Sequence, residues 1–220
     1  MRGIKCYLAY SPRLYKVLVL ILLPVAVLAL EGLNCFTDKI PLFLVLSVMV
    51  VFYECMADTW YLGGLHSKDY SGIQWIQSSQ KGLAFSKKVV LFDCLRKYVY
   101  TAVFALADLL ILYLTSGKEA VVNFAVAVWY AYWMVTGVMH LSTIVSRFVC
   151  NITGSLLMAY VATFVAAFAV ALLIGLVVFS ALSGPLWGIL MVITPMVSVG
   201  LACLLVRIGY KKMEGSYYDS

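Results

Sequence analysis

Long hydrophobic stretches dominate the chain and are separated by short polar segments. About 20 apolar residues in helical form cross the hydrocarbon core of a bilayer. Six stretches reach or approach that length, at residues 14–30, 40–57, 98–116, 120–146, 155–182 and 185–206. The last two meet at Ser183-Gly184-Pro185, which is a turn signal. The pattern therefore predicts an all-α, polytopic membrane protein with six transmembrane helices in one domain, residues 1–220.

The composition supports this prediction. Of the 220 residues, 64% are hydrophobic and 12% are charged, whereas soluble domains are about 45–50% apolar and about 25% charged. A soluble protein of this size covers its surface with polar groups, which this chain lacks. We therefore expect almost no mass outside the membrane.

Two longer polar segments stand apart from the hydrophobic stretches. Residues 1–16 mix apolar side chains with four cations, a composition typical of a segment that lies in the membrane interface or, alternatively, of a disordered basic anchor. Residues 60–97 form the longest polar segment, and we expect a cytoplasmic loop there between the second and third helices. The predicted outer loops are short, at residues 31–39, 117–119 and 183–185.

The distribution of basic residues predicts the orientation. With the N-terminus inside, 14 of the 16 Lys and Arg residues fall on one face, and only Lys39 and Lys118 fall on the other. Lys and Arg collect on the cytoplasmic side of short loops, so both termini are predicted to be cytoplasmic. Basic residues beside anionic headgroups also account for the net charge of +6. We therefore expect membrane lipids, and not nucleic acid, as the anionic partner.

Four ionisable residues within or beside the predicted spans are candidates for chemistry. Asp108 lies in the middle of the third stretch, where a charge is costly, so a proton path, a cation path or a substrate contact is the default hypothesis. The alternative is an Asp that is protonated or hydrogen-bonded to a hydroxyl on another helix. Glu54 and Asp58 share a helical face and are candidates for cation binding or acid–base chemistry, or for pairing with cations of the polar loop or with Arg147. His140 titrates near neutral pH when unperturbed, but a single buried His is more often a packing residue.

The chain lacks the common catalytic and metal-binding motifs. It contains no GxxxxGK[ST] phosphate loop, no HExxH and no GxSxG. Its six cysteines show no CxxC or other metal-ligand spacing, so no metal site is expected. ATP binding through a phosphate loop is excluded for this chain.

One segment of the polar loop carries a family resemblance. Leu83-Ala84-Phe85-Ser86-Lys87-Lys88 is followed by apolar residues that run into the third helix, and the chain ends with basic residues between Arg207 and Lys212. With six helices, a basic amphipathic start and small outer loops, this layout resembles the membrane subunits of ABC-2 type ATP-driven transporters. In that family the same loop has a short apolar stretch, then Ser with basic residues, then apolar residues.

The resemblance implies a partner and a role. Such permeases form homodimers and pair with a separate soluble ATPase subunit, which binds ATP and Mg, so no cofactor is expected on this chain. The small outer loops favour export, and members of comparable size include peptide-toxin and bacteriocin exporters in the cytoplasmic membrane of Gram-positive bacteria. An amphipathic peptide is the substrate that follows. With residues 1–16 assisting, the residues expected to contact the ATPase are Leu83, Phe85, Ser86, Lys87, Lys88 and Val89.

Three other functions stay open at this point. A proton-coupled secondary transporter would use Asp108. A membrane-embedded, lipid-modifying enzyme would use Glu54, Asp58 and His140. An assembly subunit would have no transport path of its own.

Overall fold

The computed structural model describes residues 2–37, 49–50, 53–54, 57, 79, 81–144, 165, 169 and 186–218. These residues are almost entirely helical, so the all-α prediction is confirmed for them. The elements are α1 (Arg2–Tyr10), α2 (Arg13–Tyr15), the π-helical segment η1 (Lys16–Leu22), α3 (Leu23–Thr37), α6 (Gly82–Ile144) and α8 (Leu186–Tyr218).

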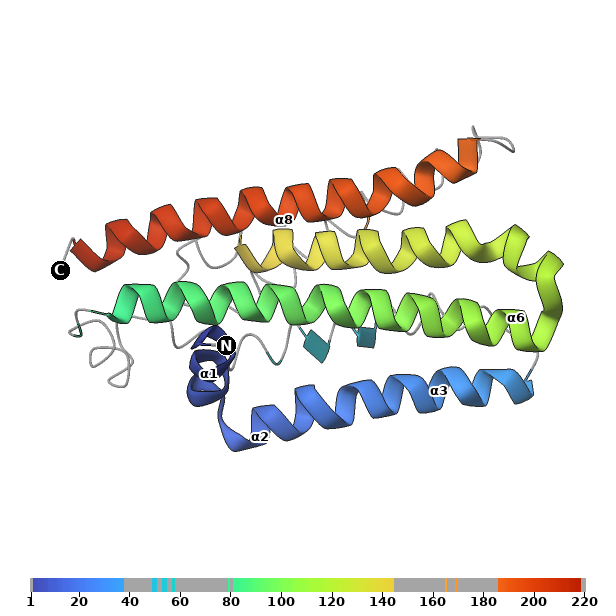
Figure 1. Ribbon diagram of the computed structural model, residues 1–220, viewed down its shortest axis with the longest axis horizontal. Coiled ribbons are helices and arrows are strands. Elements are labelled where there is room, and N and C mark those ends of the chain that lie inside the picture. The colour runs from blue at the N-terminus through green and yellow to red at the C-terminus, as the bar shows by residue number, and fades with distance from the viewer. Residues whose placement is uncertain are drawn as a thin grey trace.

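The long helices lie side by side along one axis (Figure 1). Helix α6 reverses direction at Gly117, where φ is 78° and ψ is −175°, a backbone conformation that is essentially restricted to glycine. The helix therefore reverses where a short outer loop was predicted at residues 117–119, while the position of this turn outside the membrane stays a prediction. The first turns of α6 lie at the same end of the molecule as α1 and the end of α8, which we call the terminal end, and Gly117 lies at the opposite, turn end.

Three of the described helices are long and apolar enough to cross a membrane: Arg13–Leu33, Gly82–Thr115 and Gly188–Lys211. They coincide with the first, third and sixth predicted stretches. Most of the second and fifth stretches lies outside the described residues. The fourth stretch is helical to Ile144. The total of six spans and the cytoplasmic position of the termini stay predictions.

Two predicted helix boundaries are wrong. The first helix was expected to end at Leu30, but α3 continues through Glu31 and Gly32 to Thr37. Glu31 is fully buried and accepts a hydrogen bond from Tyr132. Because its carboxyl group is buried between helices and not exposed to solvent, Glu31 does not mark the end of the helix. Helix α8 continues past residue 206 to Tyr218. Its basic residues Arg207 and Lys211 are solvent-exposed, while Tyr210 holds the helix against α6 through a hydrogen bond to the Lys87 carbonyl.

The polar loop predicted over residues 60–97 is also wrong for its last part. Residues 82–97 are helical, since α6 begins at Gly82, whose N–H donates to the Ser79 carbonyl at 2.9 Å. The prediction counted Asp93, Arg96 and Lys97 as solvent-facing. They are instead buried, and Asp93 forms ion pairs with both Arg96 and Lys97.

The first half of α6 buries polar residues and exposes apolar ones. Asp93, Lys97, Thr101 and Asp108 are all 6% exposed or less. The large apolar residues that point outward on the same helix include Leu91, Leu95, Val99, Val103, Leu106 and Leu110. A surface helix of a soluble protein shows the opposite pattern. Burial of this kind favours a hydrocarbon environment around α6.

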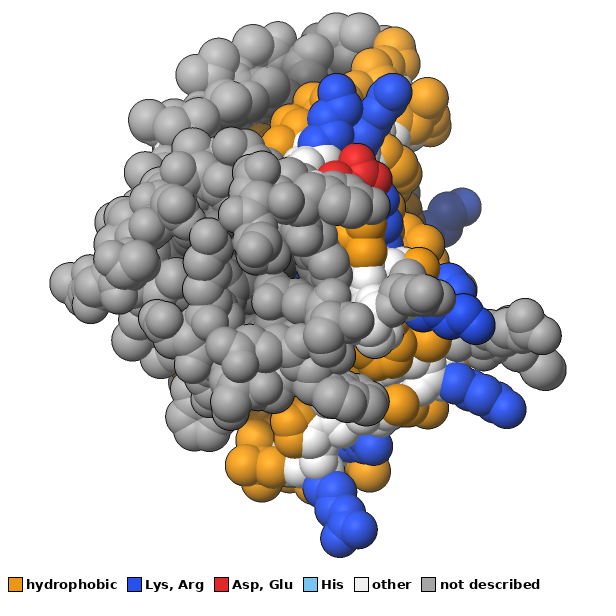
Figure 2. Space-filling view, turned by 90° about the vertical axis from the view of Figure 1, so that its left-hand side faces the viewer, with side chains coloured by type: hydrophobic (Ala, Val, Ile, Leu, Met, Phe, Trp, Pro, Cys, Tyr) orange, Lys and Arg blue, Asp and Glu red, His pale blue; other side chains and the backbone are white. Residues whose placement is uncertain are grey.

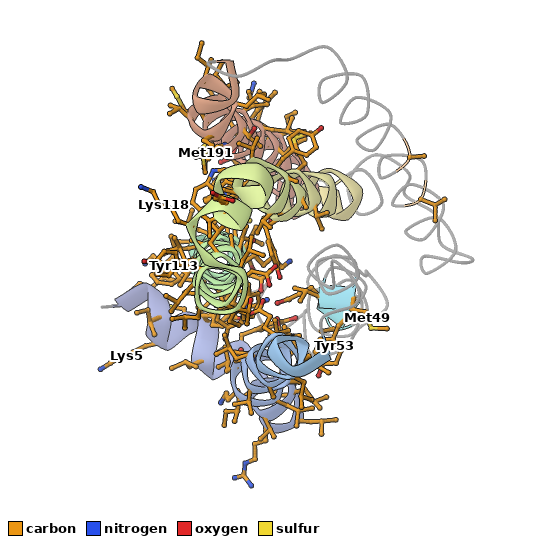
Figure 3. The ribbon with its side chains drawn as sticks, turned by 90° about the vertical axis from the view of Figure 1, so that its right-hand side faces the viewer. Lys5, Met49, Tyr53, Tyr113, Lys118 and Met191 are labelled. Atoms are coloured by element: carbon orange, nitrogen blue, oxygen red, sulfur yellow. The ribbon has the colours of Figure 1, made fainter. Side chains whose placement is uncertain are left out.

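Among the described residues, two prolines lie inside helices, and in both cases an aromatic residue of α6 donates a hydrogen bond to a backbone carbonyl for which the proline has no N–H. Pro195 has no N–H for the Met191 carbonyl one turn earlier, and the Trp129 indole N–H donates to that carbonyl at 2.9 Å. Met191 and its surroundings are visible at the turn end in Figure 3.

The π-helical segment shows the second case. The Leu23 N–H donates to the Leu18 carbonyl, five residues back, so it no longer serves Val19. The next residue, Pro24, has no N–H to continue the i to i−5 pattern. The hydroxyl of Tyr100 donates to the Val19 carbonyl at 3.2 Å instead. Aromatic side chains of α6 therefore complete the backbone hydrogen bonding of both neighbouring helices.

Candidate functional site

At the terminal end, α1 packs across the first turns of α6. The rings of Tyr10 and Phe85 meet edge to face, with centroids 6.3 Å apart. Gly3 lies so close to the Phe92 ring that any side chain there would displace it. Beneath this contact, Tyr7, Tyr15, Val19 and Val89 form a buried cluster. We call α1, residues 82–92 and residues 207–214 the terminal platform.

The end of α8 is tied to the same platform. Lys87 forms an ion pair with Glu214 and lies 5.2 Å from the ring centroid of Tyr210. The Tyr210 hydroxyl donates to the Lys87 carbonyl at 2.8 Å. The beginning of α6 is therefore held between α1 and α8.

The six residues expected to contact an ATPase divide into inward-facing and accessible ones. Val89 is fully buried and Ser86 is 2% exposed, so an outward contact role does not fit either residue, and Phe85 is half-buried against α1. Lys88 is exposed and Leu83 is partly exposed.

A different set of residues of the platform faces outward. At the beginning of α6 and just before it, the exposed positions Lys81, Ala84, Lys88 and Leu91 recur at helical spacing. On α1 the residues Ile4, Lys5 and Leu8 are exposed. Figure 2 looks onto the terminal end and shows blue Lys and Arg side chains along its described edge. The exposed positions of α1 and of the beginning of α6 therefore include both apolar and cationic side chains. The helical spacing of those on residues 81–91 could have been recognised in the sequence.

Below the platform lies a buried ionic cluster, which consists of Glu54, Asp93, Arg96 and Lys97 with the hydroxyls of Tyr7 and Tyr15. Arg96 holds both oxygens of Glu54, with Nη2 to Oε2 at 2.6 Å, and also reaches Asp93 Oδ1 at 3.0 Å. Lys97 Nζ lies 2.8 Å from Asp93 Oδ2. All four charged side chains are 9% exposed or less.

The cluster balances its own charge and includes the N-terminal segment. Two cations face two carboxylates, so the net charge is zero, which reduces the cost of burial. The hydroxyls of Tyr7 and Tyr15 donate to Asp93 Oδ1 at 3.3 and 3.2 Å, and Arg96 donates to Tyr7 from Nε at 3.0 Å. Because Tyr7 lies on α1 and Tyr15 on α2, these bonds join the platform to the membrane-spanning helices.

For Glu54, the predicted alternative of pairing with a cation of the polar segment is confirmed. Asp58 lies outside the described residues. His140 lies in the second half of α6, in the part of that helix whose side chains are not described. Sequence reasoning missed the site formed around Arg96, although the spacing of Asp93, Arg96 and Lys97 by three and four residues is a helical ion-pair signal.

Farther toward the turn end, Asp108 is not the only buried acid. Glu31, which was expected in an outer loop, is fully buried near it, and the two carboxyl groups act on each other electrostatically. The Tyr132 hydroxyl donates to Glu31 Oε1 at 3.0 Å. We call Glu31 and Asp108 the acidic pair.

Hydroxyl groups connect the helices between the ionic cluster and the acidic pair. Thr101 and Thr136 are hydrogen-bonded across the two halves of α6. The Tyr98 hydroxyl donates to the Ser198 carbonyl at 2.7 Å, and Ser198 Oγ donates to the Trp133 carbonyl at 2.9 Å. A row of buried polar side chains thus runs along α6 from the platform toward the turn end. Among the described residues, no group of three or more His, Cys, Asp or Glu is arranged to hold a metal ion.

No protein-family model, curated protein or solved structure gives a significant match to this chain. The function therefore rests on the residues and contacts described above.

Proposed function

We propose that the chain is the membrane subunit of an ATP-driven transporter of the ABC-2 type, which exports an amphipathic substrate such as a peptide. The observation that carries the proposal is the terminal platform. The two segments that the resemblance assigns to the ATPase contact are residues 1–16 and residues 78–92 of the predicted loop between the second and third helices, and they lie far apart in sequence. They are packed together through Tyr10, Phe85 and the ring of Phe92.

The accessible face of the platform suits a soluble protein partner. Ile4 is 50% exposed, and Lys5 and Lys88 are exposed as well. Protein interfaces commonly combine an apolar centre with a charged rim. An ATPase with a hydrophobic cleft and acidic residues around it would complement this face. In this proposal the exposed Lys88 contacts the ATPase, and the buried Ser86 and Val89 do not.

The contacts also supply a route for movement. When a pair of ATPase subunits closes on ATP, force on the platform moves α1 and the first turns of α6 together. The ionic cluster transmits that movement to the spans, since Arg96 is bonded to Tyr7, Tyr15 and Glu54. The ion pair between Lys87 and Glu214 carries it to α8. A second copy of the chain completes the transport path in this proposal.

The test is co-purification with a soluble ATPase that contains GxxxxGK[ST] and is encoded beside this chain. Lys88→Glu is the perturbation and Lys118→Glu is the matched control, because both lysines are exposed and Lys118 lies at the turn end, away from the platform. Like charges placed against each other at an interface cost several kcal/mol. We expect Lys88→Glu to reduce ATPase recovery by about tenfold or more, while Lys118→Glu leaves it unchanged. Equal recovery with both variants, or transport by the purified chain alone, would refute the proposal.

A further inference from the structure

The first span carries a buried stripe that repeats every four residues. Residues 13–33 are all described, and the buried side chains among them are Tyr15, Val19, Leu23, Val27 and Glu31. All five pack on α6 or bond to it. In an α-helix of 3.6 residues per turn, positions four apart drift by about 40°. A straight α-helix would therefore turn Glu31 about 160° away from Tyr15.

The π-helical segment η1 keeps the stripe on one side of the span. Its hydrogen bonds join residue i to residue i−5, so it has more residues per turn than an α-helix and reverses the drift. Tyr15 therefore reaches Asp93 at 3.2 Å, while Glu31 accepts a bond from Tyr132 at 3.0 Å, and both partners lie on α6. An α-helical segment of the same length would not keep both contacts.

The backbone carbonyl of Val19 favours the π register, with bonds from i to i−5, over the α register, with bonds from i to i−4. Pro24 has no N–H, so it cannot serve Val19 in the π register or Leu20 in the α register. The Tyr100 hydroxyl of α6 donates to the Val19 carbonyl at 3.2 Å. In the α register the Leu23 N–H would serve Val19, and the Tyr100 hydroxyl would not be needed there. Tyr100 therefore stabilises the π register.

We propose that η1 is a two-register hinge, which the Tyr100 hydroxyl holds in the π register. A change to the α register moves residues 2–15 relative to α3 by one helical position, which is about 100° of rotation and about 1.5 Å of rise. Tyr15 then leaves the ionic cluster, so the hinge decides whether the N-terminal segment is docked on α6. Single π-helical turns inside α-helices frequently lie at functional sites. This inference goes beyond the proposed transporter function and does not depend on it.

Hydrogen–deuterium exchange of the full chain in lipid nanodiscs, read by mass spectrometry, tests the proposal. Tyr100→Phe removes the hydroxyl and keeps the ring that lies beside Arg96. We expect the backbone amides of residues 2–15 to exchange about fivefold faster, the factor that corresponds to one net hydrogen bond. Tyr113→Phe, at an exposed position of the same helix, leaves the exchange unchanged.

A one-residue deletion separates a change of register from a loss of packing. Without the exposed Val17, an α-helical segment keeps the two ends of the buried stripe within about 60° of each other. The Val19 carbonyl then has a helical N–H donor and no longer needs Tyr100. Deletion of Val17 should therefore restore slow exchange to the Tyr100→Phe chain. Deletion of the exposed Leu33, which lies in α3 beyond the stripe, should not.

Three results would overturn the proposal. The first is unchanged exchange of residues 2–15 in Tyr100→Phe. The second is faster exchange that the deletion of Val17 does not reverse, which means that the hydroxyl contributes packing and does not set a register. The third is reversal by the deletion of Leu33 as well. If Tyr100→Phe fails to fold, deletion of Val17 from the native chain decides: it should leave residues 2–15 protected, and loss of their protection rejects the hinge.

Discussion

The hydrogen bond from Trp129 to the Met191 carbonyl yields a sharp prediction about the packing of α8. Pro195 leaves this carbonyl without its usual N–H donor, and the indole of Trp129 supplies one at 2.9 Å. Trp129→Phe removes the donor and keeps an aromatic ring. Pro195→Ala restores a backbone N–H for the same carbonyl. The cost of Trp129→Phe should therefore depend on which residue occupies position 195.

The magnitude follows from the energy of one hydrogen bond. A hydrogen bond contributes about 1 kcal/mol net, and a buried group left unpaired costs about 1–3 kcal/mol. Between membrane helices, measured coupling energies average about 0.6 kcal/mol and reach about 1.7 kcal/mol. We expect Trp129→Phe to cost about 1–3 kcal/mol in the native background, and about 0.5–1.5 kcal/mol less in the Pro195→Ala background. The packing lost with the larger ring is common to both backgrounds and cancels in the cycle.

The assay is reversible unfolding in mixed micelles, followed by circular dichroism, for the four proteins of a double-mutant cycle. Trp133→Phe provides the matched control. Its ring packs against Trp129 with centroids 5.6 Å apart, but its indole N–H has no hydrogen-bond partner among the described residues. A coupling to Pro195→Ala that is near zero for Trp129, or equal for Trp129 and Trp133, would refute the reasoning.

Two further predictions follow from single positions. Arg96→Leu leaves two buried carboxylates with one cation, so we expect a loss of about 3–5 kcal/mol in the free energy of unfolding; the exposed Arg207→Leu serves as control, and equal losses would argue against a paired cluster. Gly117→Ala should cost about 1–3 kcal/mol because φ is 78° there, while Gly188→Ala, in a helix with open space around it, should be neutral or stabilising. Thermal unfolding of the two Gly variants decides this, and an equal effect would mean that the turn at Gly117 is not strained by a side chain.

The local features of the fold were predictable because they depend on residues near one another in sequence. Apolar stretches of about 20 residues become long helices, and the polar residues around Gly117 interrupt one of them. Pro12 likewise separates α1 from the first span, where the Ser11 hydroxyl donates to the Tyr7 carbonyl at 2.6 Å in the last turn of α1. The composition and the asymmetric distribution of Lys and Arg also need no tertiary information.

The errors arose where polar residues were assigned to water. Residues 82–97 contain enough charge to suggest a loop, and Glu31 looked like the end of a helix. Helix boundaries shift when buried side chains find partners, since tertiary packing overrides local propensity. Arg96 is stable inside because Glu54, 42 residues away, meets it, and no sequence pattern reveals that partner.

The sequence by itself determined that this chain is helical, strongly hydrophobic and reversed at Gly117, because periodicity, length and backbone freedom are local properties. Only the tertiary structure decided which polar residues meet. It joined α1 to the start of α6, balanced the charges around Arg96, and buried Glu31 against Tyr132. The physical reason is that the energy of a buried charge depends on the groups packed around it, and those groups come from distant parts of the chain.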